Sequence, residues 1–230
     1  MPSAQSLLVL QSGAGNAAFN MAMDEALVES ATAFASPVLR FYAWTEPAAS
    51  FGYFQHYSDV ARLTQLRPLV RRPTGGGIVP HDRDWTYSVV FPPAHPWYAL
   101  TAIESYRQIH EWIQRAFARL NLSTELANAS RKAEAGQCFV GHEKFDLLWH
   151  GQKIAGAAQR RTKHGLLIQG SIQPPPIPLD RRVWQGAMLE SIPTEVSASW
   201  KELILDSRLQ RRTEELAQSK YSQSSYNQKR

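Results

Sequence analysis

Apolar residues recur at helical spacing after Asn16, a residue type that often caps the first turn of a helix. The apolar positions of this stripe are Phe19, Met23, Ala26, Leu27 and Phe34. They predict an amphipathic helix with one buried face, which Pro37 ends. Asp24 and Glu25 lie on the same stretch, but adjacent residues do not face each other on a helix, so we interpret both as mainly structural.

A second helical stripe begins at Thr101 and Glu104, whose spacing is that of a capping box. The positions that follow at three- and four-residue intervals are Ile103, Tyr106, His110, Ile113, Phe117 and Leu120. They predict a long amphipathic helix that ends at Asn121. Because His110 lies on the apolar stripe, we predict a buried histidine with its hydrogen bonds made.

Runs rich in β-branched and aromatic residues predict the strands. They are Leu7–Val9, Val38–Trp44, Trp85–Phe91, Phe145–Trp149, Lys153–Arg161 and Leu166–Ile172. The last three are separated only by the short turns His150–Gly151 and Thr162–Gly165, so we predict an antiparallel meander. The segment QPPPIP at 173–178 predicts a semi-rigid connector.

The C-terminal part carries weaker signals. Trp200, Leu203, Ile204 and Leu209 predict a last helix, and the polar stretch 219–230 predicts a disordered tail. We therefore expect a single catalytic domain over residues 1–218.

Composition and charge limit the function classes. The chain has 230 residues, 43% hydrophobic and 20% charged, which is ordinary globular composition. It has one cysteine, which fits a reducing compartment, so we expect a cytoplasmic protein without disulfides. The net charge of +5 suits an acidic protein partner. Because the basic residues are scattered, we expect no nucleic-acid partner. No apolar run approaches the ~18 residues of a membrane span, so we expect no membrane partner.

The densest chemical signal is the stretch from Arg71 to Phe91, RRPTGGGIVPHDRDWTYSVVF. Three consecutive glycines let a ligand lie directly on the backbone, and exposed N–H groups attract anions or carbonyl oxygens. Arg71 and Arg72 add permanently charged donors suited to carboxylate or phosphate. The loop matches neither a Walker motif nor a dinucleotide fingerprint. The alternative interpretation is a tight turn between two strands.

The stretch as a whole resembles the signature loop of the lipoate–protein ligase, biotin ligase and octanoyltransferase superfamily. The resemblance continues through NAAFNMAMDEAL, FGYFQ and CF…FDLLWHGQKIAGAAQRR…LLIQGSI, from about Asn16 to Ile172. It implies an α+β fold with a mixed, mainly antiparallel sheet flanked by helices, like the class II synthetase and biotin ligase core. It also implies that the glycine loop wraps an acyl chain.

The resemblance assigns roles to particular residues. Lys153, in the hallmark G-x-K-I-x-G, is expected to bind the acyl carbonyl, and Cys138 matches the catalytic cysteine of one octanoyltransferase class. A lysine nearby would favour the thiolate. The expected substrate-binding residues are Tyr53, Gln55, Arg72, Thr74, Gly75, Gly76, Gly77, His81, Gly156, Ala157 and Ala158. His81 is expected to fix the loop by hydrogen bonds. No metal site is expected, because one cysteine and dispersed histidines lack the spacing.

Three functions remain open from the sequence. The preferred one transfers octanoate from octanoyl-acyl carrier protein, through a Cys138 thioester, to a lysine of a lipoyl-domain protein, without a cofactor. The acceptor would be a glycine cleavage H protein or a 2-oxoacid dehydrogenase E2. The second is an ATP- and Mg²⁺-dependent lipoate–protein ligase, which Gly77 favours because ligases more typically have a third glycine. The third is a non-catalytic binding protein on the same fold.

Overall fold

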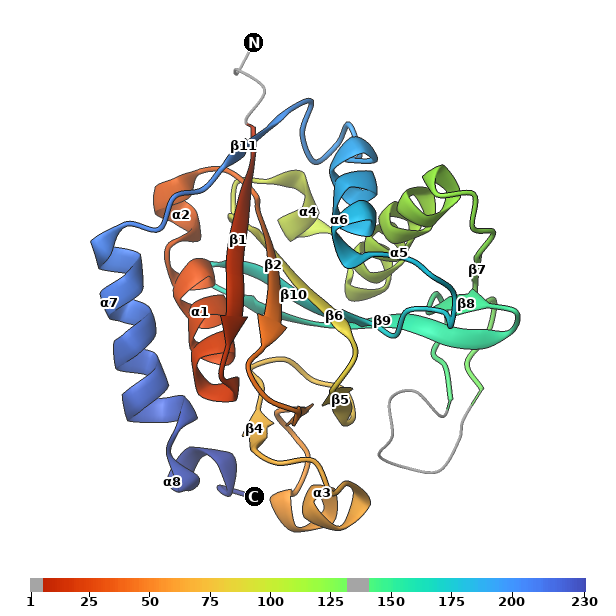
Figure 1. Ribbon diagram of the computed structural model, residues 1–230. Coiled ribbons are helices and arrows are strands. Elements are labelled where there is room, and N and C mark those ends of the chain that lie inside the picture. Colours follow the sequence, from red (N-terminus) through yellow and green to blue (C-terminus); the bar gives the residue numbers. More distant parts are fainter. Residues whose placement is uncertain (1–5, 132–140) are drawn as a thin grey trace.

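The computed structural model describes residues 6–131 and 141–230, and a mixed eight-stranded sheet forms its centre (Figure 1). The strand order is β11–β1–β2–β6–β10–β9–β8–β7. The strands are β1 (Leu7–Gly15), β2 (Val38–Trp44), β6 (Trp85–Phe91), β7 (Glu125–Leu126), β8 (Leu147–Trp149), β9 (Gln152–Thr162), β10 (Gly165–Ile172) and β11 (Trp200–Glu202). β1 pairs in parallel with β2 and β11, and the other pairs are antiparallel. The mixed, mainly antiparallel sheet is thus confirmed.

Helices cover both faces of this sheet (Figure 1). α1 (Ala17–Glu29) and α7 (Ser207–Leu216) pack on one face, and α5 (Ala102–Arg119) and α6 (Arg181–Glu190) pack on the other. Since side chains alternate along a strand, Leu8 and Leu10 join the core under α1 and α7, while Leu7 and Val9 join the core under α5 and α6. The shorter helices are α2 (Ala31–Phe34), α3 (Tyr57–Leu63), α4 (Pro96–Ala99), a π-helix (Ala217–Tyr221) and α8 (Ser224–Asn227).

Both predicted helix starts are confirmed. The Asn16 side chain accepts a hydrogen bond from the Phe19 backbone N–H, and Thr101 and Glu104 form a complete capping box. α5 ends at Arg119 with Asn121 in the left-handed region, and the meander of β8, β9 and β10 is antiparallel as expected. None of the helices within residues 6–131 and 141–230 is long and apolar enough to span a bilayer.

A small second sheet carries the glycine loop. Its strand order is β4–β3–β5, with β4 (Leu69–Arg71), β3 (Ala48–Phe51) and β5 (Val79–His81). β3 pairs in parallel with β4 and antiparallel with β5. The loop between β4 and β5 is therefore held at both ends by β3, which fixes where its glycines lie.

The C-terminal expectations were wrong in two places. Trp200 begins strand β11 rather than a helix, because its backbone pairs with β1. The stretch 219–230 is folded, not a disordered tail: Tyr221 is buried and its hydroxyl donates to Glu25. Asn227 is also buried, and its Oδ1 accepts a hydrogen bond of 2.8 Å from the Arg71 backbone N–H. Contacts with distant segments thus order this polar segment.

A buried ion pair joins α1 to the sheet. Asp24 Oδ1 lies 2.7 Å from Arg40 Nη1, and both side chains are fully buried. The other Asp24 contacts are hydrogen bonds from Tyr42, Ser88 and Gln169. The interpretation of Asp24 as structural agrees with this position.

Arg40→Met is expected to destabilise the fold by about 3–5 kcal/mol, because it leaves the Asp24 carboxylate buried without its cation. Equilibrium urea unfolding measures the change. Arg119→Met is the matched control, since the Arg119–Glu190 pair is exposed and such pairs contribute about 0–1 kcal/mol. Equal losses in the two variants would contradict the expectation.

His110 is buried on the apolar stripe of α5, as predicted, but only one of its ring nitrogens has a partner. Nδ1 donates to the Tyr106 carbonyl at 2.9 Å, and Nε2 has no hydrogen-bond partner in the described part of the chain. Burial lowers the pKa of His110 from 6.5 to about 4. The ring is therefore neutral in the folded protein at neutral pH.

The lowered pKa of His110 predicts acid sensitivity. Above pH 6.5 the ring is neutral in both states, and as pH falls from 6.5 to about 4 only the unfolded chain binds its proton. The loss of unfolding free energy from this group is on the order of 3 kcal/mol at pH 4. Urea unfolding at several pH values should show a shallower acid slope for His110→Gln than for the unmodified chain. An identical slope in the variant would contradict the assignment.

Candidate active site

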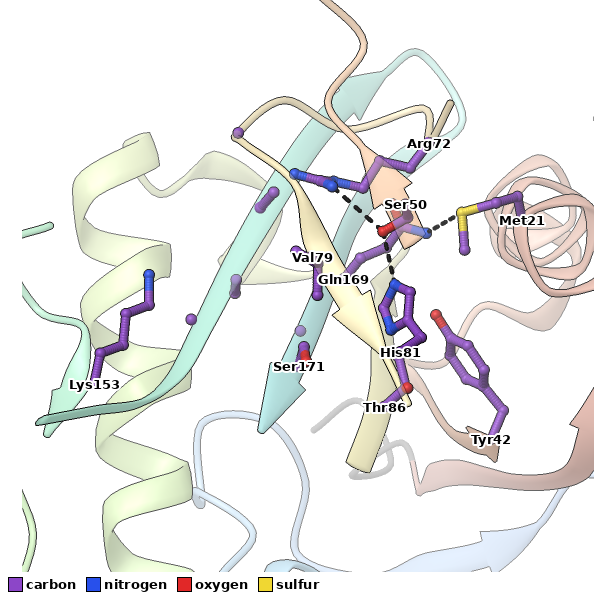
Figure 2. Close-up of a pocket in the computed structure, with 15 residues that line it drawn as sticks. Met21, Tyr42, Ser50, Arg72, Val79, His81, Thr86, Lys153, Gln169 and Ser171 are labelled. Atoms are coloured by element: carbon purple, nitrogen blue, oxygen red, sulfur yellow. Dashed lines mark hydrogen bonds between the residues drawn. The ribbon is translucent and has the colours of Figure 1, made fainter. Parts of the chain in front are cut away.

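A cavity opens between the small sheet and strands β9 and β10 (Figure 2). The space within it amounts to about 490 Å³, part of which is open to solvent. The lining residues are Met21, Tyr42, Ser50, Arg72, Gly76, Val79, His81, Thr86, Lys153, Gly156, Ala157, Ala158, Gln169, Gly170 and Ser171. The wall formed by 156–158 is small and largely apolar, whereas charged and hydroxyl groups converge from β3, β4 and β5.

Arg72 braces the glycine loop from inside. Its Nε and Nη2 donate to the Gly75 carbonyl, and Nη2 also donates to the Gly77 carbonyl at 2.8 Å. Gly76 lies between them with φ +88, where a side chain would be strained and its Cβ would sit 2.7 Å from the guanidinium. The loop therefore needs a glycine at this position. Arg71 points elsewhere, to the carbonyls of Tyr53, Gln55 and Asn227.

Lys153 enters the cavity from β9, held by a buried carboxylate. Its Nζ lies 2.8 Å from Asp146 Oδ2, with the lysine side chain 8% exposed and the aspartate side chain fully buried. The Glu143 backbone N–H and the Tyr106 hydroxyl also donate to Asp146. Burial, with Asp146 adding to it, raises the pKa of Tyr106 well above its usual value, so the hydroxyl stays protonated.

Gly156 makes room for this lysine. A Cβ there would lie 2.7 Å from Lys153 Cε and 2.8 Å from Nζ. The glycine of the hallmark segment therefore determines where the amine can sit, as well as shaping the apolar wall.

The glycine loop is tied to the core by a polar chain. The Thr74 hydroxyl donates to Gln169 Oε1 at 2.7 Å, and Gln169 Nε2 donates to Asp24 Oδ2 at 2.7 Å. Because each of these groups is buried, displacing the loop would leave polar atoms without partners. Thr74 thus holds the loop from behind.

His81 is fixed by three neighbours. Its Nδ1 lies 2.8 Å from Asp84 Oδ2, its Nε2 lies 2.8 Å from Ser50 Oγ, and its ring stacks on Trp44 at 3.8 Å. His81 thus makes hydrogen bonds with Ser50 and Asp84 and not with the adjacent Asp82, and its expected role in fixing the loop stays a prediction. A histidine between a hydroxyl and a carboxylate is an arrangement able to move protons.

The structure brings most of the predicted residues together. Those that line the cavity are Arg72, Gly76, His81, Lys153, Gly156, Ala157 and Ala158. Thr74, Gly75 and Gly77 belong to the same loop and are held by the bonds described above. Cys138, with its neighbours Gly136, Gln137 and Phe139, lies outside the described residues, so its predicted role stays a prediction.

Tyr53 and Gln55 do not line the cavity, contrary to expectation. The chain turns outward after Gly52, and Gln55 uses its side chain to accept from the Gly52 N–H. The Tyr53 ring packs instead under Lys229, whose Nζ lies 3.8 Å from the ring centroid. Both residues shape the outer side of the loop.

Sequence reasoning missed Ser50, Asp84, Tyr106 and Asp146. Tyr106 falls on the helical stripe and looked like an ordinary core residue. Asp146 stands at the start of an apolar run, and a charged residue in that position was the one available signal for a buried partner.

Chemically, the cavity can hold an acyl chain against the small apolar wall, with Lys153 on one side and Ser50 on the other as polar groups for its carbonyl. The described residues contain no group of three or more His, Cys, Asp or Glu side chains arranged to hold a metal. The arrangement fits acyl transfer assisted by cationic donors.

Comparisons with known proteins point the same way. The family model described as Lipoyl protein ligase A/B catalytic domain matches residues 16–173. Octanoyltransferase LipM of Bacillus subtilis is 36% identical over 176 residues, covering 71% of this chain and 63% of that protein. LipM of Geobacillus kaustophilus is 39% identical, with 71% and 63% covered. This chain spans less than two thirds of the length of these curated relatives.

Solved structures share the fold. Lipoate-protein ligase A bound with ATP has a TM-score of 0.79 at 22% identity, covering 98% of each chain. A bi-partite lipoate protein ligase from Thermoplasma acidophilum has a TM-score of 0.72 at 20% identity, covering 97% of this chain and 96% of that one. At these identities the likeness concerns the fold.

Proposed function

Because this chain belongs to the lipoyl protein ligase A/B catalytic domain family, we propose that it transfers an octanoyl or lipoyl group to a lysine of a lipoyl-domain protein. The observation that carries the proposal is the Lys153 amine, held by Asp146 at the cavity beside the glycine loop. The named octanoyltransferase relatives support an acyltransferase reaction. The acceptor would be a glycine cleavage H protein or a 2-oxoacid dehydrogenase E2.

The proposed donor is octanoyl-acyl carrier protein, and the proposed route is covalent. Cys138 gives up its thiol proton and attacks the thioester carbonyl, the carbon–sulfur bond to the carrier breaks, and the carrier thiolate takes up a proton in place of the one that Cys138 lost. The acceptor lysine amine then attacks the acyl-cysteine, loses a proton, and releases the Cys138 thiol. No cofactor is consumed in either step, because one thioester replaces another before the amide forms.

Lys153 serves both steps in this scheme. Its ammonium group, fixed at 2.8 Å from Asp146, would donate to the carbonyl oxygen as negative charge develops there. The Arg72 guanidinium keeps the glycine loop closed, so the acyl chain lies against backbone and the small 156–158 wall. Binding energy along the chain then positions the carbonyl.

Mass spectrometry of the intact protein tests this function. After incubation with octanoyl-acyl carrier protein, we expect one octanoyl group on the protein, removable by hydroxylamine, and loss of that adduct in Cys138→Ser. Adding a lipoyl domain should move the group to its lysine without ATP. Lys153→Ala should lower the transfer, and Lys163→Ala, at an exposed turn lysine, is its matched control.

The ligase alternative predicts the opposite pattern. The run Gly75–Gly77 is the feature that favours it, since a third glycine is more typical of the ligases. If Cys138→Ser keeps full activity and the acceptor is modified only with free lipoate, ATP and Mg²⁺, the thioester route is wrong. Lys153 and the glycine loop would then hold an acyl-adenylate.

A further inference from the structure

Ser50, His81 and Asp84 form a hydroxyl–imidazole–carboxylate chain that acyl transfer through Cys138 does not use. Ser50 Oγ lies 2.8 Å from His81 Nε2, and His81 Nδ1 lies 2.8 Å from Asp84 Oδ2. Ser50 and His81 line the cavity, and Asp84 is buried behind the ring. The three groups come from β3, the end of β5 and the turn before β6, so the pairing of β3 with β5 sets their spacing.

The direction of the protons follows from the neighbours of Asp84. Asp84 Oδ2 also accepts from the Ser171 hydroxyl at 2.7 Å and from the Thr86 hydroxyl at 3.1 Å. Trp44 Nε1 donates to Thr86 Oγ1, which leaves the Thr86 proton directed to Asp84. A carboxylate that only accepts requires a proton on His81 Nδ1, so the neutral ring has a lone pair on Nε2. Ser50 therefore donates its hydroxyl proton to the ring.

The surroundings favour a transient positive charge on His81. Its ring is held by stacking on Trp44, and Asp84 Oδ1 has no hydrogen-bond partner within the described residues. The negative charge of the buried Asp84 carboxylate can therefore stabilise a protonated His81 ring. This is the condition under which a histidine can take a proton from a serine.

The cavity also supplies a place for the acyl group. Arg72 Nη1 lies 3.4 Å from Ser50 Oγ, close enough to donate to an oxygen that becomes negative beside it. Figure 2 shows Ser50 and His81 on one side of the cavity and Lys153 on the other. A chain lying along the 156–158 wall can therefore present its carbonyl to either side.

We propose that Ser50, His81 and Asp84 are a second nucleophilic group, which hydrolyses medium-chain acyl thioesters and esters in this cavity independently of Cys138. Ser50 Oγ bonds to the acyl carbon as its proton passes to His81 Nε2. The carbon–sulfur bond then breaks, and the departing thiolate takes that proton. Water attacks the acyl-serine, giving its proton to His81, which returns it to Ser50 Oγ as the carboxylic acid leaves.

The test uses octanoyl-pantetheine without any acceptor protein and measures released thiol and octanoic acid. We expect slow turnover in the full-length chain and in Cys138→Ala. The hydrolysis rate should fall about 10³-fold in Ser50→Ala and in His81→Gln. It should also fall in Asp84→Asn, although the serine is still present, because the introduced amide favours the wrong tautomer of His81. Ser105→Ala, a buried serine on α5 away from the cavity, is the matched control.

A fluorophosphonate probe supplies a second measurement that does not depend on turnover. Peptide mapping should find the label on Ser50, and His81→Gln should prevent it while circular dichroism shows the fold retained. The proposal is overturned if Ser50 stays unlabelled, if Ser50→Ala hydrolyses at the normal rate, or if hydrolysis disappears in Cys138→Ala. The last result would leave the proposed transferase intact, which separates the two ideas.

Discussion

Gly52→Ala is expected to reduce acyl transfer by about 100-fold or more while leaving the protein folded, because the glycine loop would have to move. A Cβ on Gly52 would lie 1.9 Å from the Gly76 carbonyl oxygen, 2.9 Å from the Gly76 carbonyl carbon and 3.0 Å from the Gly75 carbonyl carbon. These are backbone atoms, so no side-chain rotation relieves the overlap. The loop must shift by about an ångström, which takes Gly76 and the Arg72 contacts out of place.

The measurement is the octanoylation rate of a lipoyl domain, together with a thermal unfolding curve. Gly186→Ala is the matched control, since a Cβ at this glycine of α6 meets nothing within 4 Å. It should leave the rate unchanged and stabilise the helix slightly. A Gly52→Ala protein with a normal rate would show that the loop does not hold the acyl chain.

Local signals predicted the elements that local interactions form. The strand Val38–Trp44 and the capping box at Thr101 were placed to the residue, because side-chain period and cap chemistry operate over a few neighbouring positions. The prediction of a disordered tail was wrong because it rested on the polar composition of residues 219–230. Composition cannot reveal the Tyr221–Glu25 hydrogen bond, whose partners are 196 positions apart. The same reason applies to Trp200, whose strand exists only beside β1.

The site shows the same difference between local signals and distant partners. The glycine loop and Lys153 could be recognised from the sequence alone, because their residue types are unusual together. The partners that orient them do not: Asp146 meets Tyr106 across 40 positions and Ser50 meets His81 across 31. Tyr53 and Gln55 were placed at the site by motif alone, and the outward turn after Gly52 takes both away from the cavity.

The second large loss of transfer is expected at Lys153 and at Asp146, the carboxylate that orients it. Lys153→Met should lower transfer by about 10²–10⁴-fold, because it removes a positioned donor near the reacting carbonyl. Asp146→Asn should also lower it strongly, since the ammonium loses the carboxylate at 2.8 Å that fixes its position. The two residues act through one amine, so the double variant should lose no more than Lys153→Met alone.

A double-mutant cycle on the octanoylation rate measures this coupling, with urea unfolding to follow stability. Tyr106→Phe, which removes one donor to Asp146 but keeps the lysine pair, should lose less than Asp146→Asn. Asp146→Asn removes a fully buried carboxylate that is paired with the Lys153 ammonium, so it should also lower the unfolding free energy. Rate losses that multiply across the cycle would show that Asp146 contributes by some path other than Lys153.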